Sequence, residues 1–399
     1  MTLYIDPPNA AGHGRLWSHL VSDTSYEELH RFARRLGIPH RGFDRDHYDI
    51  PAERYDAVVA LGVTPVSSRE LIAVLTAAGL RRRKAEALLP KRPGRSLVRA
   101  ARLRAGDRVA VVAPAGPVAG PGLDAGLAVL RSWGLEVVEG EHLRGTHERL
   151  RYLAAGDAAR ARDLARAWSD PDVTAVLCAR GGYGAQRIVD LLDWPSLALA
   201  GPKVLVGFSD ITALHRAFAA RLGLATIHGP SVTSLATGDR ESRDHLRSML
   251  FDPVPGTTLT PAPARTLVGG RAEGVLVGGN LALLAADVGT GSSLSSAGSI
   301  VVLEEVGEAP YRVDRLLTQL LRVGWFDGAR GIVVGALTDC GAAAELHEVL
   351  VDRLAPLGLP TVLDAPFGHA ARNLAFPFGV PAVLDADAGT LVLRSPALQ

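Results

Sequence analysis

The sequence has little of what several classes of protein require. Only two of its 399 residues are cysteines, Cys178 and Cys340, too few for a disulfide framework. The net charge is +1, so the chain lacks the positive excess of a general nucleic-acid or membrane-surface binder. No apolar run approaches the roughly 18 residues of a membrane span, and the first residues lack the basic start and apolar core of a signal peptide. We therefore expect a soluble cytoplasmic protein that binds neither nucleic acid nor membranes.

The chain is long enough for about two or three domains, and its 47% hydrophobic fraction is enough to fill their cores. A basic stretch between Leu80 and Gly106 holds a single acid, Glu86, and two prolines that would break a long helix. Such a stretch could touch RNA or an acidic partner, but a solvated linker is the favoured interpretation. We expect a small domain at residues 1–90 and a basic linker at 91–105.

The first ninety residues predict a small α/β domain. Leu3 to Ile5 reads as a strand, Pro51 as the opening of a helix, and Thr24 with Glu27 and Ser67 with Glu70 read as capping boxes. Histidines and aspartates gather here, and they could bind a divalent metal or phosphate, although a structural role is favoured because no pair has a recognised ligand spacing; the main candidates are His19, Asp23, Asp46 and His47. The segments Arg15-Leu16-Trp17-Ser18-His19-Leu20 and Arg45-Asp46-His47-Tyr48-Asp49 resemble a small bacterial domain family of unassigned function.

Beyond Gly106 the chain alternates strands with helices of about ten residues, which predicts a parallel sheet with sites at the carboxyl ends of its strands. The expected strands are Arg108–Ala113, Leu135–Val138, Val173–Cys178 and Val204–Val206, and the expected helices are Gly122–Trp133, Asp157–Trp168 and Ala185–Leu192.

The stretch from Val204 to His215 carries the strongest chemical signal. A buried strand is followed by Gly207 and then by a helical pattern from about Ile211, which places Ser209 where a strand turns into a helix. That placement is typical of a nucleophile elbow, because the turn exposes the serine hydroxyl above the edge of the sheet. Serine is also a common helix N-cap, so the position alone leaves both roles open.

A glycine-rich turn, Arg180-Gly181-Gly182-Tyr183-Gly184, follows the strand that ends at Cys178. It lacks the Lys-Ser/Thr pair of a phosphate-binding P-loop and the spacing of a dinucleotide fingerprint. Adjacent glycines do let backbone N–H groups approach a ligand closely. The turn could supply half of an oxyanion hole, with the N–H of Asp210 as the other half.

The last third of the chain adds further candidates. Residues 251–263, rich in Pro and Thr, read as a crossing between lobes. The strand Ile300–Leu303 runs directly into Glu304, and residues 382–393 could form a hairpin turning near Gly389. His369 lies in a glycine-flanked loop, where an imidazole can be reachable and mobile, or can simply be a surface side chain.

Taken together, several motifs resemble the LD-carboxypeptidase family of serine peptidases from about Gly106 to the C-terminus. They are the turns at 180–184 and 207–210, Gly278-Gly279-Asn280, Leu303-Glu304-Glu305-Val306-Gly307-Glu308 and Gly368-His369. The resemblance implies a two-lobed α/β fold, with a nucleophile-bearing parallel-sheet lobe at 106–250 and a C-terminal α/β lobe at 251–399. It also implies a homodimer without a metal or other cofactor in the peptidase region.

The resemblance further implies Ser209 as nucleophile, His369 as general base and Glu304 as the group that orients the imidazole. Glu305 leaves the choice of acid open from chemistry alone. His215, six residues after Ser209 on a helix, should face away from the hydroxyl. The expected oxyanion donors are the backbone N–H groups of Gly182 and Asp210, and the expected substrate-binding residues are Arg180, Tyr183, Asn280 and His228, the last of which could line the pocket.

Three functions remain open. The first, implied by the resemblance, is hydrolysis of the bond before the terminal D-alanine of peptidoglycan tetrapeptides during cell-wall recycling. The second is an amidase acting on a peptide-nucleotide antibiotic, which an aromatic side chain able to stack a base, such as Trp325 or Trp194, would favour. The third is a non-catalytic module that binds muropeptides. The sequence does not distinguish a lysine from a diaminopimelate substrate.

Overall fold

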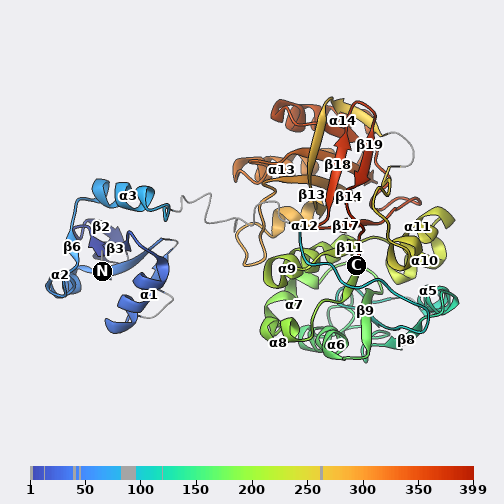
Figure 1. The fold of residues 1–399 in the computed structure, drawn as a ribbon, viewed down its shortest axis with the longest axis horizontal. Helices are drawn as coiled ribbons and strands as arrows, with labels where there is room; N and C mark the ends of the chain where they lie inside the picture. Colours follow the sequence, from blue (N-terminus) through green and yellow to red (C-terminus); the bar gives the residue numbers. More distant parts are fainter. Residues whose placement is uncertain are drawn as a thin grey trace. The chain divides into compact units, whose positions relative to one another are not determined.

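The computed structural model describes residues 3–12, 14–38, 42–44, 46–81, 96–118, 120–260 and 264–399. The chain divides into two compact units, Met1–Leu88 and Leu89–Gln399 (Figure 1). Each unit has its own sheet system and hydrophobic core. Among the described helices, none combines the length and apolar character needed to cross a membrane.

The first unit is built on one sheet with the strand order β4-β5-β3-β1-β6, and β2 pairs with β3. The strands are β1 Leu3–Ile5, β2 Ala10–Gly12, β3 Arg15–Ser22, β4 Phe43–Asp44, β5 His47–Pro51 and β6 Thr64–Pro65, and the α-helices are α1 Tyr26–Arg35, α2 Tyr55–Ala60 and α3 Ser68–Ala77. The predicted capping box of Ser67 and Glu70 is confirmed. The other is wrong by one residue: Ser25 caps α1, because the Thr24 hydroxyl donates to Asp23 instead.

The second unit begins with a six-stranded sheet of order β17-β11-β10-β9-β7-β8, parallel except for β17. Its strands are β7 Arg108–Val112, β8 Glu136–Glu139, β9 Val173–Cys178, β10 Val204–Gly207, β11 Thr226–His228 and β17 Phe376–Phe378. Val109 and Val111 face one core with α5 Gly120–Ser132, α10 Val232–Thr237 and α11 Arg240–Phe251. Ala110 and Val112 face the other, with α6 Asp157–Ser169, α7 Ala185–Ile188, α8 Trp194–Leu199 and α9 Thr212–Leu222. The predicted parallel sheet is confirmed, and helices cover both of its faces.

A second sheet has the order β12-β16-β15-β14-β13-β18-β19. Its elements are β12 Arg265–Val268, β13 Arg271–Asn280, β14 Ser299–Val306, β15 Gly331–Thr338, β16 Thr361–Leu363, β18 Pro381–Asp385 and β19 Thr390–Leu393, with α12 Leu281–Ala286, α13 Pro310–Arg322 and α14 Ala343–Leu354. The hairpin predicted around Gly389 is confirmed by the pairing of β18 with β19. Strand β14 runs on past the predicted end, so Glu304 lies within it. Of the expected crossing segment, Thr258 bridges to Val392, and residues 261–263 lie outside the described part.

Of the predicted linker at 91–105, residues 91–95 lie outside the described part of the chain, and the described residues from Ser96 onward contact the second unit. The Leu97 N–H donates to the Gly379 carbonyl, Val98 bridges to Leu224, and the Leu103 N–H donates to the Leu250 carbonyl. Ala100 and Leu103 are buried. Apolar residues interleaved among the arginines therefore anchor this segment to the second unit, a pattern that the count of positive charges conceals.

Candidate active site

Ser209 lies immediately beyond β10, at the start of a 3-10 turn over Ser209–Ile211 that leads into α9. Its φ of 65° is in the left-handed region, which a non-glycine residue rarely adopts. Gly207 makes the sharp turn possible, because a Cβ there would lie 2.9 Å from Ile211 Cγ2 and 3.0 Å from Cys178 Cβ. The strained strand-to-helix turn is the geometry of a nucleophile elbow.

The His369 imidazole joins Ser209 to Glu304. Its Nε2 lies 2.9 Å from Ser209 Oγ, and its Nδ1 lies 2.7 Å from Glu304 Oε2. The Glu304 side chain is fully buried, whereas that of His369 is 19% exposed. Gly368 allows this approach: its φ is 102°, and a Cβ would lie 2.7 Å from Glu304 Cβ. The Asn373 side chain fixes the loop by accepting the Gly368 N–H at 2.9 Å.

The Glu305 side chain makes different contacts from those of Glu304. Its carboxylate accepts the Ala282 N–H at 2.7 Å, the Asn280 side-chain amide at 2.8 Å and the Val306 N–H at 2.9 Å. It thereby ties the start of α12 to β14, and burial raises its pKa. Because adjacent strand residues point to opposite faces, only Glu304 meets His369. The structure thus distinguishes two carboxylates that the sequence left equivalent.

The glycine-rich turn after β9 lies directly against Ser209. A Cβ on Gly181 would lie 2.8 Å from Ser209 Cβ and 3.1 Å from Ser209 Oγ. Gly182 has a φ of 108° and packs on Gly116, whose Cα would be 3.2 Å from an added Cβ. The turn therefore needs small residues at both positions. The sequence indicated the glycine pair but not the contact of Gly181 with the serine or the role of Gly116.

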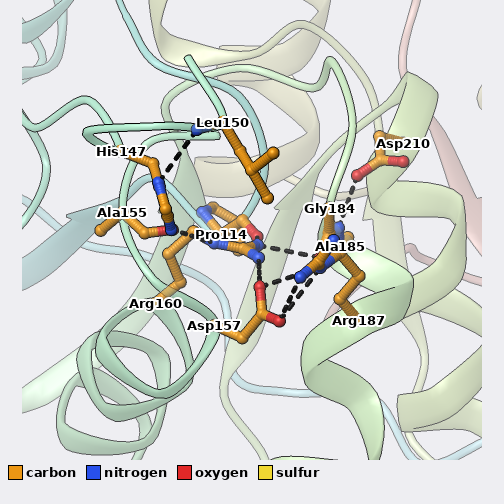
Figure 2. Close-up of polar contacts among 10 residues, drawn as sticks. All are labelled: Pro114, His147, Leu150, Ala155, Asp157, Arg160, Gly184, Ala185, Arg187 and Asp210. Atoms are coloured by element: carbon orange, nitrogen blue, oxygen red, sulfur yellow. Dashed lines mark hydrogen bonds and ion pairs between the residues drawn. The ribbon is translucent and has the colours of Figure 1, made fainter. Parts of the chain in front are cut away.

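Asp210 connects the glycine-rich turn to the turn that carries Ser209. Its carboxylate accepts the Ala185 N–H at 2.7 Å, and burial raises the pKa of this carboxyl to about 6 (Figure 2). Only its backbone N–H was expected to matter.

Arg160 is a second positioning residue, and no sequence motif pointed to it. The buried guanidinium donates to the carbonyls of Ala155, Pro114 and Gly184, and it pairs with Asp157, which also pairs with Arg187 (Figure 2). It therefore joins the loops that follow β7 and β9 to the start of α6. A buried arginine that satisfies backbone carbonyls fixes loops that have little regular structure of their own.

The predicted substrate-binding residues fall into two groups. Arg180 and Tyr183 are exposed; Arg180 donates to the Pro117 carbonyl at 3.1 Å, and Tyr183 packs edge-on against Tyr152 with ring centroids 5.7 Å apart. Asn280 is buried as the N-cap of α12. His228 is fully buried, stacks on Phe376, and has no hydrogen-bond partner among the described residues on either ring nitrogen. The expectation that His228 lines the pocket is therefore wrong, because aromatic rings enclose it.

His215, which was expected to face away from the Ser209 hydroxyl, contacts Thr226 and Gly207 instead. Its ring nitrogens lie 2.9 Å from Thr226 Oγ1 and 2.8 Å from the Gly207 carbonyl.

A small cavity of about 50 Å³ adjoins His369, with Phe208, Ser234, Asp239, Ser242 and Arg243 among its lining residues. Arg243 is a cation near the imidazole that the sequence did not single out.

Glu141, His142 and Asp163 form one group of possible metal ligands in the described part of the second unit. Sequence inspection missed this group, since Asp163 is remote along the chain. None of its members belongs to the Ser209, His369 and Glu304 set.

A serine in a strained strand-to-helix turn, hydrogen-bonded to a histidine that is held by a buried carboxylate, is an arrangement typical of serine hydrolases. Comparison with known families agrees with this class. Residues 109–229 match the LD-carboxypeptidase N-terminal domain and residues 273–384 match the LD-carboxypeptidase C-terminal domain. The chain belongs to the LD-carboxypeptidase family of hydrolases. Residues 3–78 match a protein family of unknown function, DUF4031.

Individual relatives cover the second unit. A Streptomyces coelicolor protein named "Putative carboxypeptidase" is 55% identical over 306 residues, 76% of this chain and 98% of that protein. The murein tetrapeptide carboxypeptidase of Pseudomonas aeruginosa is 40% identical, covering 68% of this chain and 91% of its own length. The crystal structure of muramoyltetrapeptide carboxypeptidase from Oxalobacter formigenes matches with a TM-score of 0.63 at 30% identity, over 71% of this chain and 97% of that one. An MccF-like protein from Bacillus anthracis shares the fold, with a TM-score of 0.69 at 23% identity over 74% and 99%.

Proposed function

We propose that the protein is a serine LD-carboxypeptidase that removes the terminal D-alanine from peptidoglycan tetrapeptides. The observation that carries the proposal is the pair of hydrogen bonds linking Ser209, His369 and Glu304. Two relatives at 30 and 40% identity bear names that specify a murein or muramoyl tetrapeptide substrate.

In this mechanism His369 Nε2 takes the proton of the Ser209 hydroxyl as Oγ attacks the scissile carbonyl. Glu304 accepts the Nδ1–H, fixes the tautomer and stabilises the imidazolium. The N–H groups of Gly182 and Asp210 stabilise the oxyanion. His369 then gives its proton to the departing amine of D-alanine, and water hydrolyses the acyl-enzyme by the same route in reverse.

The substrate must present a terminal carboxylate, which a nearby cation would recognise. Arg180 is the candidate on the glycine-rich turn, and the exposed Tyr183 beside it offers an apolar surface for the peptide stem. We infer a cytoplasmic homodimer acting in cell-wall recycling. Mass measurement in solution and cell fractionation test these two points.

D-alanine release from tetrapeptides carrying either lysine or diaminopimelate is the decisive assay. Ser209→Ala should lower turnover by at least a thousandfold with an unchanged melting temperature, because no other group replaces the nucleophile. Ser132→Ala, a change of an exposed serine on α5, is the matched control. Turnover of Ser209→Ala within tenfold of wild type would rule out the covalent route.

The amidase alternative depends on an aromatic side chain that can stack a base. Trp325 is fully buried and donates to the Leu294 carbonyl, and Trp194 packs on Phe218, so neither serves. The exposed pair of Tyr152 and Tyr183 is the remaining candidate, which keeps this function open. One solved MccF complex contains aspartyl sulfamoyl adenosine. Faster hydrolysis of that compound than of tetrapeptide would favour the amidase, and tetrapeptide binding without hydrolysis would favour a binding module.

A further inference from the structure

In the first unit, His19, His47 and Asp49 lie on neighbouring antiparallel strands and point to one place. His19 on β3 is the register partner of Asp49 on β5, and His47 precedes Asp49 by two residues. Since side chains alternate along a strand, all three lie on the same face of the sheet. Their possible ligand atoms lie within 4.8 Å of one another.

Both imidazoles are held by buried carboxylates through the same ring nitrogen. Asp6 Oδ2 lies 3.0 Å from His19 Nδ1, and Asp46 Oδ1 lies 2.8 Å from His47 Nδ1. The two aspartates are each 1% exposed. In a neutral imidazole, a carboxylate that accepts the Nδ1–H leaves the Nε2 lone pair available, and this is the usual support of a metal-bound histidine; the ion displaces any proton held on Nε2.

These supporting aspartates are themselves fixed. Asp6 also accepts the His19 backbone N–H at 2.6 Å and the Ser68 hydroxyl at 2.6 Å. Asp46 pairs with Arg81 at 2.8 Å. The aspartates that orient the rings are therefore held in turn by groups from β3, α3 and the segment after α3, more support than a surface histidine receives.

The two Nε2 atoms converge on Asp49. Oδ1 of Asp49 lies 3.4 Å from His47 Nε2 and 4.0 Å from His19 Nε2. A tetrahedral zinc ion with bonds of about 2.0 to 2.1 Å separates its ligands by about 3.4 Å. The pair of His47 and Asp49 already has this spacing, and His19 needs a movement of about 0.6 Å relative to Asp49 to reach the same value.

We propose that His19, His47 and Asp49 form a binding site for a divalent transition-metal ion such as Zn²⁺, with Asp6 and Asp46 as positioning residues. Two imidazoles and one carboxylate are ligands that suit such ions. The Asp49 side chain is 44% exposed and that of His19 31% exposed, so the site is open on one side. Three protein ligands leave a coordination position for water or an anionic oxygen, as in catalytic rather than structural zinc sites.

The test is to measure zinc binding to the tag-free full-length protein by calorimetry and elemental analysis. The protein is first stripped of metal with a chelator and dialysed. We expect one equivalent bound, and at least a hundredfold loss of affinity in His19→Gln and in His47→Gln. Asp49→Asn, a change at a partly exposed side chain, should lower affinity at least tenfold without loss of circular dichroism signal. Asp6→Asn should lower it about 10- to 100-fold by releasing the His19 ring.

His142→Gln is the matched control, because Glu141, His142 and Asp163 form the other group of possible metal ligands among the described residues. This variant should bind zinc as wild type does. Co²⁺ loaded in place of zinc should give the visible absorption of a tetrahedral site in wild type and His142→Gln but not in Asp49→Asn. No binding at tenfold excess of zinc, or zinc affinity within threefold of wild type in the His19→Gln, His47→Gln double variant, would overturn the assignment. Loss of binding only in His142→Gln would overturn it equally.

Discussion

Replacing Gly181 with alanine tests whether the glycine-rich turn sets the position of the nucleophile. The added Cβ would lie 2.8 Å from Ser209 Cβ, whereas ordinary contacts begin at 3.4 Å, so the two must separate by 0.6 Å (3.4 − 2.8). The φ of Gly181 is not in the left-handed region, so alanine meets no backbone penalty there. The contact alone accounts for the expected effect.

Little in the surroundings can yield. The Cβ would also lie 3.1 Å from the Phe208 carbonyl oxygen, which is backbone, and Ser209 is held in the left-handed conformation by the elbow. A displacement of about 1 Å of a reacting group costs on the order of a hundredfold in rate. We therefore expect Gly181→Ala to lower kcat for D-alanine release by about 10- to 100-fold, which is about 1.4 to 2.7 kcal/mol in the barrier.

Gly122→Ala is the matched control, since in the described part of the chain no atom outside its own helix lies within 4 Å of a Cβ at that position on α5. It should leave kcat unchanged and raise stability by up to about 1 kcal/mol through helix propensity. Both variants are compared by steady-state kinetics and thermal unfolding. A kcat of Gly181→Ala within threefold of wild type, with an unchanged melting temperature, would show that the turn does not position Ser209.

Three further outcomes are expected. Glu304→Gln should lower kcat at least a hundredfold, whereas Glu305→Gln should chiefly lower the melting temperature by loosening α12; equal kcat losses would contradict the distinct contacts of the two carboxylates. Burial lowers the pKa of His215 to about 4 from 6.5. Between these two pH values the unfolded chain binds more protons than the folded chain. The contribution of His215 to stability is therefore present above about pH 6.5 and is lost toward pH 4. The difference in free energy of unfolding between wild type and His215→Gln should therefore shrink by about 3 kcal/mol from about pH 7 to pH 4, the opposite effect of Asp210 being common to both proteins; a constant difference would refute this. A protein beginning at Ser96 should keep D-alanine turnover within threefold of the full chain, because the described residues from Leu97 are anchored to the second unit; a hundredfold fall or aggregation would show that the first unit is required.

Sequence patterns predicted the elements well where burial dictates the pattern. The strands ending at Cys178 and Gly207 are hydrophobic on both faces. Loop-borne contacts were harder, because they depend on tertiary geometry. A count of arginines hid the anchoring of Leu97 and Leu103, and no local signal distinguished Glu304 from Glu305.

Histidines were the least predictable residues of the site. His228 and His369 both follow apolar segments, and only the resemblance separated them. In the structure the first is enclosed by Phe208 and Phe376, whereas the second contacts Ser209. The cluster of His19, His47 and Asp49 lacked a recognised ligand spacing because its members come from paired strands, where register rather than sequence distance sets proximity.

The site combines groups from two sheets. Both sheets belong to the second unit. Ser209 follows β10 of the six-stranded sheet, and Glu304 lies within β14 of the seven-stranded sheet. His369 lies on the segment that runs from β16 in the seven-stranded sheet to β17 in the six-stranded sheet. Val206, Val302 and Phe376 belong to a single shared core, so the packing between the sheets fixes the distances from the imidazole to both partners. A close-packed interface holds such distances more rigidly than a loop could by itself, because each layer resists small displacements of the other. The geometry of the proposed triad therefore depends on how the two sheets dock as well as on the three side chains.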